Sequence, residues 1–286
     1  MMEFADTSPS VQVEPAEYHR LLGYPRDHVL SGRSRELADW AREWYGRHGQ
    51  PWIYARQAER LEIANGSVRI DGVPFTSKRL QATLQQALAH STFLVAAAAG
   101  PEVEEQANRL WREEKPDEYF FLEILGSAVV EHLIATAGAR LCAWAEERGM
   151  AVLPHYSPGY SQWDIVEQGP LLRLIQNTRD HALPGKVEAL DSGALRPKKS
   201  QLGVFGLTRH TARVRRLADL IPCENCSFAA CQYRRTPYLR DCQEISSSIA
   251  GDRSLTVAAR KAHRSRDRKG AVGAVLRHKG TNGNNR

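Results

Sequence analysis

The stretch EYFFLEILGSAVVEHLIATAGARLCAWAEE, residues 118–147, decides the fold of this chain. It consists almost entirely of helix-forming residues and is apolar over most of its faces, which is typical of a helix buried inside a protein. Gly126, Ser127 and Gly138 are small, and we expect another backbone to approach the helix closely at these positions. The sequence therefore predicts one long central helix against which the other elements pack.

Shorter patterns on both sides of this stretch predict further elements. Apolar residues recur at helical spacing in some segments, whereas others are short, apolar and bounded by turn residues such as Asn65-Gly66. The predicted helices lie near residues 37–44, 78–89, 164–168 and 170–176, and the predicted strands at 61–63, 68–70, 92–98, 187–190 and 201–207. Strands and helices that do not alternate regularly favour an α+β fold, with a mixed or antiparallel sheet and long helices, over a doubly wound sheet.

Length and composition set the class of the protein. The chain has 286 residues, of which 42% are hydrophobic, enough for one large domain or two small ones. The longest uncharged apolar stretch, residues 93–99, is far shorter than the roughly 20 residues of a membrane helix, so we expect no membrane association. Glu3 and Asp6 stand where a secretory signal would carry basic residues. We therefore expect a soluble, cytoplasmic protein.

The charge is divided unevenly along the chain. The net charge is +6, but residues 253–286 hold ten Lys and Arg and one Asp, so this segment carries +9 and the rest of the chain −3. The basic character thus describes the carboxyl-terminal segment and not the folded body. We expect an N-terminal extension (1–30), an α+β domain (31–212), a small cysteine-rich lobe (213–250) and a basic, disordered tail (251–286).

Four of the five cysteines lie within twenty residues. Cys223, Cys226, Cys231 and Cys242 form the pattern C-x2-C-x4-C-x10-C. A C-x2-C turn lets two thiolates converge on one metal, and two further cysteines complete the set that tetrahedral zinc or an iron–sulfur cluster requires. This pattern predicts a metal site in preference to disulfides or unligated thiols, and its spacing leaves zinc and iron equally open. Cys142, within the long apolar helix, is interpreted as a buried, inert thiol.

Three motifs carry a resemblance to a known family. They are GSAVVE at 126–131, HYSPGY at 155–160 and LDSGALRPKKS at 190–200. Together they resemble the activation domain of cobalamin-dependent methionine synthase. That family shows a helix that ends in a glutamate, a basic residue before a Pro-Gly-Tyr loop, and a Ser-x-Ala-Met-x-Pro-x-x-Ser segment before a strand. His155 stands where the family has arginine, and Leu195 where it commonly has Met.

The resemblance implies binding of S-adenosylmethionine in an extended groove. By this resemblance, Glu131 would hold the amino group, the backbone of 156–160 would line the cofactor, and Tyr160 would offer a ring face to the sulfonium. His155 remains a hydrogen-bond donor but is largely neutral at pH 7, so it would hold the carboxylate more weakly than arginine. The candidate cofactor-binding residues are Glu131, His155, Tyr156, Ser157, Pro158, Gly159, Tyr160 and Phe205.

The resemblance also implies a partner protein. The chain lacks the Asp-x-His-x-x-Gly signature of a cobalamin-binding segment, so the corrinoid would be carried by a methyltransferase or a methionine synthase subunit. The implied activity is reductive reactivation of that corrinoid, with S-adenosylmethionine as methyl donor. Separate corrinoid-activating proteins use iron–sulfur centres, so the four cysteines would hold one by this resemblance. With zinc, a flavodoxin or ferredoxin would deliver the electron instead.

Two other functions remain open. One is a zinc-stabilised module that docks on a partner or places the basic tail on nucleic acid. Nucleic-acid binding is the less favoured interpretation because residues 253–286 contain no aromatic residue to stack on bases. The other is a protein that keeps the family's fold and docking role but has lost the cofactor, as His155 suggests.

Overall fold

A computed structural model of the chain describes residues 1–24, 28–64, 67–177 and 182–214. The chain divides into two units, Met1–Tyr238 and Leu239–Arg286, and every described residue belongs to the first. The Asn65-Gly66 turn, the four clustered cysteines and the basic tail therefore lie outside the described residues. The domain boundaries drawn near residues 213 and 250 stay predictions.

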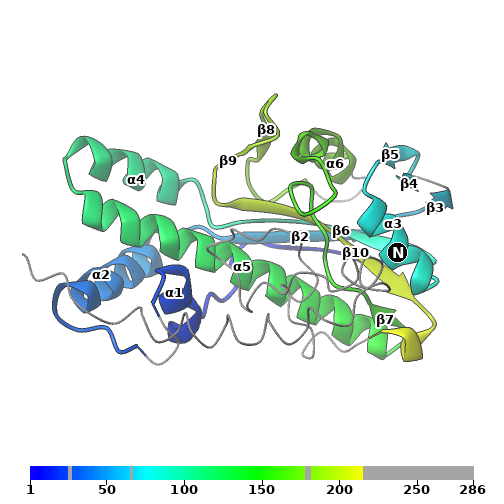
Figure 1. Cartoon of the computed structure of the whole chain (residues 1–286), viewed down its shortest axis with the longest axis horizontal. Coiled ribbons are helices and arrows are strands. Elements are labelled where there is room, and N and C mark those ends of the chain that lie inside the picture. Colours follow the sequence, from blue (N-terminus) through cyan, green and yellow to red (C-terminus); the bar gives the residue numbers. More distant parts are fainter. Residues whose placement is uncertain (25–27, 65–66, 178–181, 215–286) are drawn as a thin grey trace, which may run out of the picture. The chain divides into compact units, whose positions relative to one another are not determined.

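The described part is built on a five-stranded antiparallel sheet with the strand order β1-β2-β6-β10-β7. The fold class predicted from the sequence, α+β with an antiparallel sheet and long helices, is confirmed. Figure 1 shows the sheet between two layers of other elements. The five strands are β1 (Glu3–Asp6), β2 (Trp52–Gln57), β6 (Ser91–Ala98), β7 (Ala151–Val152) and β10 (Ser200–Thr208).

Burial on both faces explains the composition of the central strand. All eight residues of β6 are buried, which fits its run of apolar residues, because neither face meets solvent. Alternation along the strand sends Phe93 and Val95 to one hydrophobic cluster and Leu94 and Ala96 to the other. Each side of the sheet thus has its own core.

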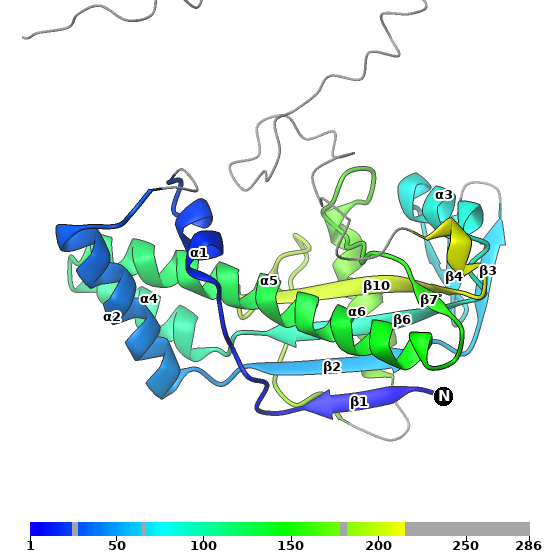
Figure 2. The ribbon, with the colours of Figure 1, turned by 90° about the horizontal axis from the view of Figure 1, so that it is seen from below.

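Helix α5 (Pro116–Glu146) is the main element on the first face and runs unbroken through the stretch that the sequence singles out. Figure 2 shows it lying across the sheet with α1 (Pro15–Leu21) and α2 (Gly32–His48) beside it. By length and composition α5 is the one helix among the described residues that could cross a membrane, but 61% of its most apolar window is buried. Its burial is that of a core helix.

The second face is covered by smaller elements. Helix α3 (Lys78–Gln86) begins at Ser77, whose side chain accepts a hydrogen bond from the amide of Leu80 as a helix cap does. The 3₁₀ helix η1 (Ile165–Glu167) leads directly into α6 (Gln168–Gln176). A small antiparallel sheet joins these helices, formed by β3 (Leu61–Ala64), β4 (Ser67–Ile70) and β5 (Val73–Phe75).

The amino-terminal segment, expected as an extension, contributes to the same sheet and core. Strand β1 pairs with β2, and α1 packs against α5 through Tyr18, whose hydroxyl donates to the carbonyl of Phe121 at 2.7 Å. The remaining elements are α4 (Glu102–Arg112), the pair β8 (Glu188–Ala189) and β9 (Leu195–Arg196), and the 3₁₀ helix η2 (Thr211–Arg213).

The glycines of α5 were expected to let another backbone approach the helix closely, but this expectation is wrong. A Cβ atom at Gly126 would lie 2.9 Å from side-chain atoms of Lys199 and Val103, and one at Gly138 would lie 3.1 Å from the ring of Phe205. Side chains, and not another backbone, occupy the space that these glycines leave.

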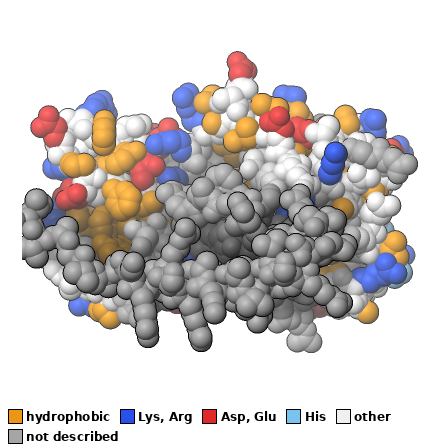
Figure 3. Space-filling view, viewed as in Figure 1, with side chains coloured by type: hydrophobic (Ala, Val, Ile, Leu, Met, Phe, Trp, Pro, Cys, Tyr) orange, Lys and Arg blue, Asp and Glu red, His pale blue; other side chains and the backbone are white. Residues whose placement is uncertain are grey.

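Apolar side chains are exposed over α4 and the first turns of α5 (Figure 3). Trp111 is 63% exposed and Phe120 is 44% exposed. Isolated apolar side chains are common on protein surfaces, so these two residues do not by themselves indicate a binding site.

Candidate functional site

Strand β10 and the lysine directly before it turn a row of alternating residues toward α5. Successive side chains of a strand point to opposite faces, so positions 199, 201, 203 and 205 share the face that α5 covers. Lys199 reaches Ser127 of α5, and Phe205 lies against Gly138 of the same helix. Between them lie Gln201 and Gly203, where the strand meets the 155–160 loop. Polar groups are unusual where a helix packs on a sheet, which makes this row a candidate site.

The 155–160 loop is held along the edge of β10. The amide of Leu153 donates to the carbonyl of Gly206 at 2.8 Å, and Tyr156 and Val204 exchange two hydrogen bonds of 2.9 Å. This pairing continues the alternation of a strand and places His155 and Ser157 on the α5 side. A Cβ atom at position 203 would lie 3.6 Å from each of them, which is ordinary van der Waals contact.

Three polar side chains meet at the end of the loop. The Nε2 atom of His155 lies 3.0 Å from the hydroxyl oxygen of Tyr160, and the side-chain amide of Gln201 donates to that oxygen at 2.8 Å. The ring of Phe205 lies beneath, with its centroid 5.5 Å from that of His155. Phe205 is only 1% exposed, whereas Tyr160 is 41% exposed. Phe205 therefore supports the imidazole, and Tyr160 presents its ring to solvent.

The environment of Tyr160 keeps its hydroxyl protonated. Desolvation raises the pKa of Tyr160 to about 12; the hydrogen bond from Gln201 opposes this shift, and the negative charge of Glu131 adds to it. The side chain of Ser157, which is buried, also lowers the pKa of Tyr160. Glu131 of α5 thus lies near enough to Tyr160 for its charge to act on that hydroxyl.

Tyr156 serves the loop in a different way from its neighbours. Its side chain points to the opposite face of the sheet, where its ring stacks on Trp163 at 6.0 Å and the guanidinium of Arg79 lies 5.8 Å from the ring centroid. Its hydroxyl donates to the carbonyl of Ser161. The ring of Tyr156 also meets the ring of Tyr160 edge-on, with centroids 5.5 Å apart. The side chain of Tyr156 thus fixes the loop and supports Tyr160.

The Pro158-Gly159 turn has the conformation that its residue types favour. Gly159 has a φ of +92°, which residues with a side chain rarely adopt, and its amide donates to the carbonyl of Trp163 at 2.9 Å. The carbonyl of Pro158 accepts a hydrogen bond of 3.2 Å from the side chain of Gln168. Both contacts fix the backbone that carries Tyr160.

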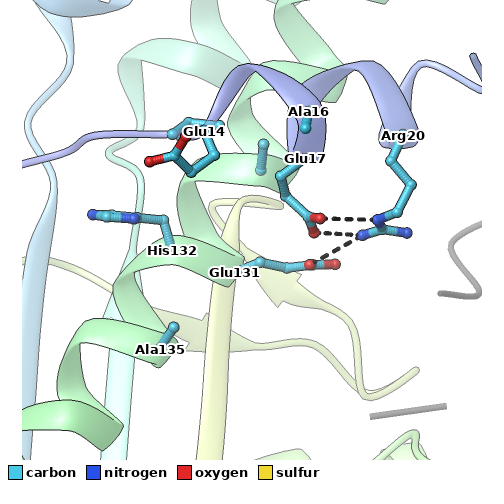
Figure 4. Close-up of a pocket in the computed structure, with 9 residues that line it drawn as sticks. Glu14, Ala16, Glu17, Arg20, Glu131, His132 and Ala135 are labelled. Atoms are coloured by element: carbon cyan, nitrogen blue, oxygen red, sulfur yellow. Dashed lines mark hydrogen bonds and ion pairs between the residues drawn. The ribbon is translucent and has the colours of Figure 1, made fainter. Parts of the chain in front are cut away.

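Glu131 also lines a hollow of about 460 Å³ between α1 and α5. Figure 4 shows Arg20 of α1 and Glu131 pointing toward one another, with Glu17 beside them. Arg20 binds Glu17 at 2.6 Å and Glu131 at 3.4 Å. Sequence reasoning missed Glu17 and Arg20, although Pro15 at the first helical position and apolar residues at 18 and 21 indicate a short helix here.

A lysine–glutamate cluster lies at the start of β10. The Nζ atom of Lys199 lies 3.1 Å from a carboxylate oxygen of Glu123 and 3.0 Å from the hydroxyl of Ser127, and Lys198 lies 3.1 Å from the other oxygen of Glu123. Burial opposes ionisation of Glu123, but Lys199 and Lys198 outweigh it and hold the pKa of that carboxyl below its usual value. The cluster joins α5 to β10 beside the loop.

The predicted metal ligands Cys223, Cys226, Cys231 and Cys242 lie outside the described residues, so their site stays a prediction. Within the described ranges, no three His, Cys, Asp or Glu side chains are grouped as metal ligands would be. Cys142 is partly buried, and burial, with a contribution from Glu146, raises the pKa of its thiol to about 11. The burial is thus less complete than the sequence predicted, and the inertness of the thiol stays a prediction, favoured by its raised pKa.

Comparison with known proteins gives a fold-level similarity. No family model matches this sequence, and no curated protein matches it. Among solved structures, the chain is similar to the crystal structure of the MetH reactivation domain bound to AdoHcy, with a TM-score of 0.48 and 13% sequence identity. The similarity covers 64% of this chain and 69% of that chain. A likeness at this level carries no conclusion about ligand or activity, which depend on the residues described above.

Proposed function

We propose that this protein binds S-adenosylmethionine where the 155–160 loop, β10 and α5 meet, and that it supports reductive reactivation of a corrinoid-dependent methyltransferase, a methionine synthase subunit being the first candidate. One observation carries the proposal. His155 contacts both Tyr160 and Phe205, which come from separate segments, and the charge of Glu131 acts on Tyr160. These are the residues on which the sequence resemblance to the methionine synthase activation domain depends.

The chemistry of these residues fits the proposed ligand. S-adenosylmethionine carries an ammonium and a sulfonium group, both positive, and one carboxylate. Glu131 is a carboxylate suited to the ammonium, and the exposed ring of Tyr160 offers a face that attracts a sulfonium through cation–π interaction. The backbone of residues 156–160 lines the cofactor. Phe205 is buried beneath His155, and Tyr156 is partly buried with its ring against Tyr160, so both act as positioning residues.

The proposed reaction needs an electron and a methyl group. One electron reduces the partner's Co(II) to Co(I), whose electron pair then attacks the methyl carbon of S-adenosylmethionine. The carbon–sulfur bond breaks, and methylcobalt and S-adenosylhomocysteine are the products. No general base is required, so the contribution of this chain is to position the methyl group over the corrinoid and to exclude water.

Which group donates the electron depends on the metal that the four clustered cysteines bind. We propose that Cys223, Cys226, Cys231 and Cys242 bind either an iron–sulfur cluster or zinc. An iron–sulfur cluster would deliver the electron itself. A zinc ion would stabilise the surrounding segment, and a flavodoxin or ferredoxin would be the electron donor.

An anaerobic reconstitution tests this function. A methionine synthase subunit without its own activation domain is held in the Co(II) state and mixed with reduced flavodoxin and S-adenosylmethionine labelled in its methyl group. We expect labelled methylcobalt to form, detected by absorbance and by label on the corrinoid, only when the chain is present. The Trp111→Ala variant, altered at an exposed aromatic on α4, should be as active as the unmodified chain. Failure of the label to reach cobalt with the intact chain would overturn the proposal.

A further inference from the structure

The hollow between α1 and α5 combines charges of both signs. Three glutamates line it, together with Arg20 and His132 (Figure 4). The glutamates are Glu14, Glu17 and Glu131. A purely acidic hollow would suit a simple cation, but an arginine among carboxylates suits a ligand that carries a cation and an anion on adjacent atoms. The α-amino acid group is such a ligand, because its ammonium and carboxylate share one carbon.

Arg20 is fixed in place by its neighbours. Its side chain is 11% exposed, and its guanidinium donates to both oxygens of Glu17, at 3.0 and 2.6 Å, and to Glu131 at 3.4 Å. The side chain of Glu131 is more open, at 36% exposed. The weaker contact, between Arg20 and Glu131, thus lies where a ligand can enter from the hollow.

We propose that Arg20 binds the carboxylate of the ligand's amino acid group, while Glu131 and Glu17 bind its ammonium. The inference rests on the proposed function and identifies a residue that the sequence motifs do not contain. A ligand inserted in this way exchanges ion pairs, because its carboxylate takes the place of Glu131 at Arg20 and its ammonium takes the place of Arg20 at Glu131. The charges of the hollow therefore stay paired, and planar bidentate donation suits arginine for this role.

Other cations of the site are less suited to this role. Lys199 is held by Glu123 and Ser127, which lie about two turns and one turn before Glu131 on α5. The loop from 155 to 163 contains no lysine or arginine. The hollow and the loop are also linked electrostatically, since the charge of Glu131 acts on Tyr160. In this proposal one extended ligand places its amino acid end at Arg20 and its sulfonium at the ring of Tyr160.

Two ligands that differ only in the amino acid group test the inference. S-adenosylhomocysteine has that group, and 5′-methylthioadenosine lacks it. Both are titrated by calorimetry into the full chain and into the Arg20→Met, Arg20→Lys and Arg33→Met variants. Arg33→Met is the matched control, since Arg33 forms an exposed ion pair with Glu118 on α5. Thermal unfolding of each variant shows whether the fold is kept.

We expect Arg20→Met to weaken the binding of S-adenosylhomocysteine about 10- to 100-fold, because a charge-assisted contact is lost. The affinity for 5′-methylthioadenosine should be unchanged. The affinity of Arg20→Lys for S-adenosylhomocysteine should lie between those of Arg20→Met and the unmodified chain, and that of Arg33→Met should equal the affinity of the unmodified chain. Equal weakening of both ligands, or no weakening of either, would overturn the role of Arg20 while the proposed function stands. If the unmodified chain bound neither ligand, the proposed function would fail, and this inference with it.

Discussion

The imidazole Nε2 of His155 lies 3.0 Å from the hydroxyl of Tyr160, and Gln201 of β10 donates to the same hydroxyl at 2.8 Å. This contact joins the two ends of the 155–160 loop and attaches them to the central sheet. The ring of Tyr160 is thereby held at the surface beside α5. A loop fixed at both ends has little conformational freedom to lose on binding a ligand, which favours affinity.

Lys199→Met should destabilise the protein by about 1–3 kcal/mol at pH 7, because it removes a largely buried partner of Glu123. Lys198→Met is the matched control. Lys198 contacts the same carboxylate but is 44% exposed, so its loss should cost under about 1 kcal/mol. Urea unfolding at pH 7 measures both differences, and equal costs for the two variants would contradict this account.

The ion pair between Glu123 and Lys199 makes the stability of the protein depend on pH. The pKa of Glu123 is depressed in the folded protein, so the stability that its ionisation contributes is present above the unfolded pKa, near 4.3, and is lost as pH falls through the folded pKa. The stability difference between the unmodified protein and Lys199→Met should therefore shrink as pH falls from about 5 to about 3. Unfolding curves across that range would refute the assignment if the difference stayed constant.

Gly206→Ala and Gly203→Ala form a second matched pair on β10. A Cβ atom at Gly206 would overlap the side chain of Leu153 and lie 2.7 Å from that of Leu84, whereas one at Gly203 would have ordinary contacts of 3.6 Å. We expect Gly206→Ala to cost about 1–3 kcal/mol through overpacking and Gly203→Ala to change stability by less than about 1 kcal/mol. Thermal unfolding distinguishes the two, and a neutral Gly206→Ala would show that this edge of the core is loosely packed.

Cys142 should resist alkylation in the folded protein. Burial raises the pKa of its thiol to about 11, so only a minute fraction is thiolate at pH 7.5. Iodoacetamide treatment followed by peptide mass spectrometry should leave Cys142 unmodified in buffer and modify it fully in urea. Rapid modification in buffer would contradict the burial described for this residue.

Tyr45→Phe should change the alkaline limit of stability. The hydroxyl of Tyr45 donates to the carbonyl of Ala99 at 2.8 Å, and burial, with a smaller effect of Glu102, raises the pKa of Tyr45 well above its ordinary value. The unfolded chain ionises this group near pH 10 while the folded protein keeps the proton, so stability falls as pH rises above about 10.

Tyr45→Phe lacks the hydrogen bond to Ala99 and should be less stable by about 1 kcal/mol at pH 8. It also lacks the ionisable hydroxyl, so this source of destabilisation above about pH 10 is absent from the variant. Its deficit relative to the unmodified protein should therefore narrow between pH 8 and pH 11 in urea unfolding. Parallel decline of the two proteins would argue against a buried, protonated Tyr45.

Local patterns predicted the elements whose signals are strong. The apolar run at 118–147 forms α5, the helix predicted at 78–89 corresponds to α3, and the strand predicted at 92–98 corresponds to β6. Strand β2 was missed because it is buried on both faces and its residues do not alternate. Helix α4 was also missed, although Val103, Ala107 and Leu110 have helical spacing.

The candidate site was predictable only in part. The HYSPGY motif is local, so the sequence locates the loop, and the resemblance connects it to Glu131 and Phe205. The contact between Arg20 and Glu131 spans 111 residues and depends on how α1 lies against α5. No pattern within either helix specifies that packing, which is why Arg20 and Glu17 emerged only from the fold.

The central claim is that the surface around Tyr160 binds S-adenosylmethionine, and one calorimetric titration tests it most directly. S-adenosylmethionine is titrated into anaerobically purified, metal-loaded protein, with S-adenosylhomocysteine as the comparison ligand and with the Tyr160→Ala and Trp111→Ala variants as the matched pair. We predict saturable binding of both ligands that Tyr160→Ala weakens at least tenfold and Trp111→Ala leaves unchanged. Absence of binding to the unmodified protein, or equal binding to Tyr160→Ala, would contradict the claim.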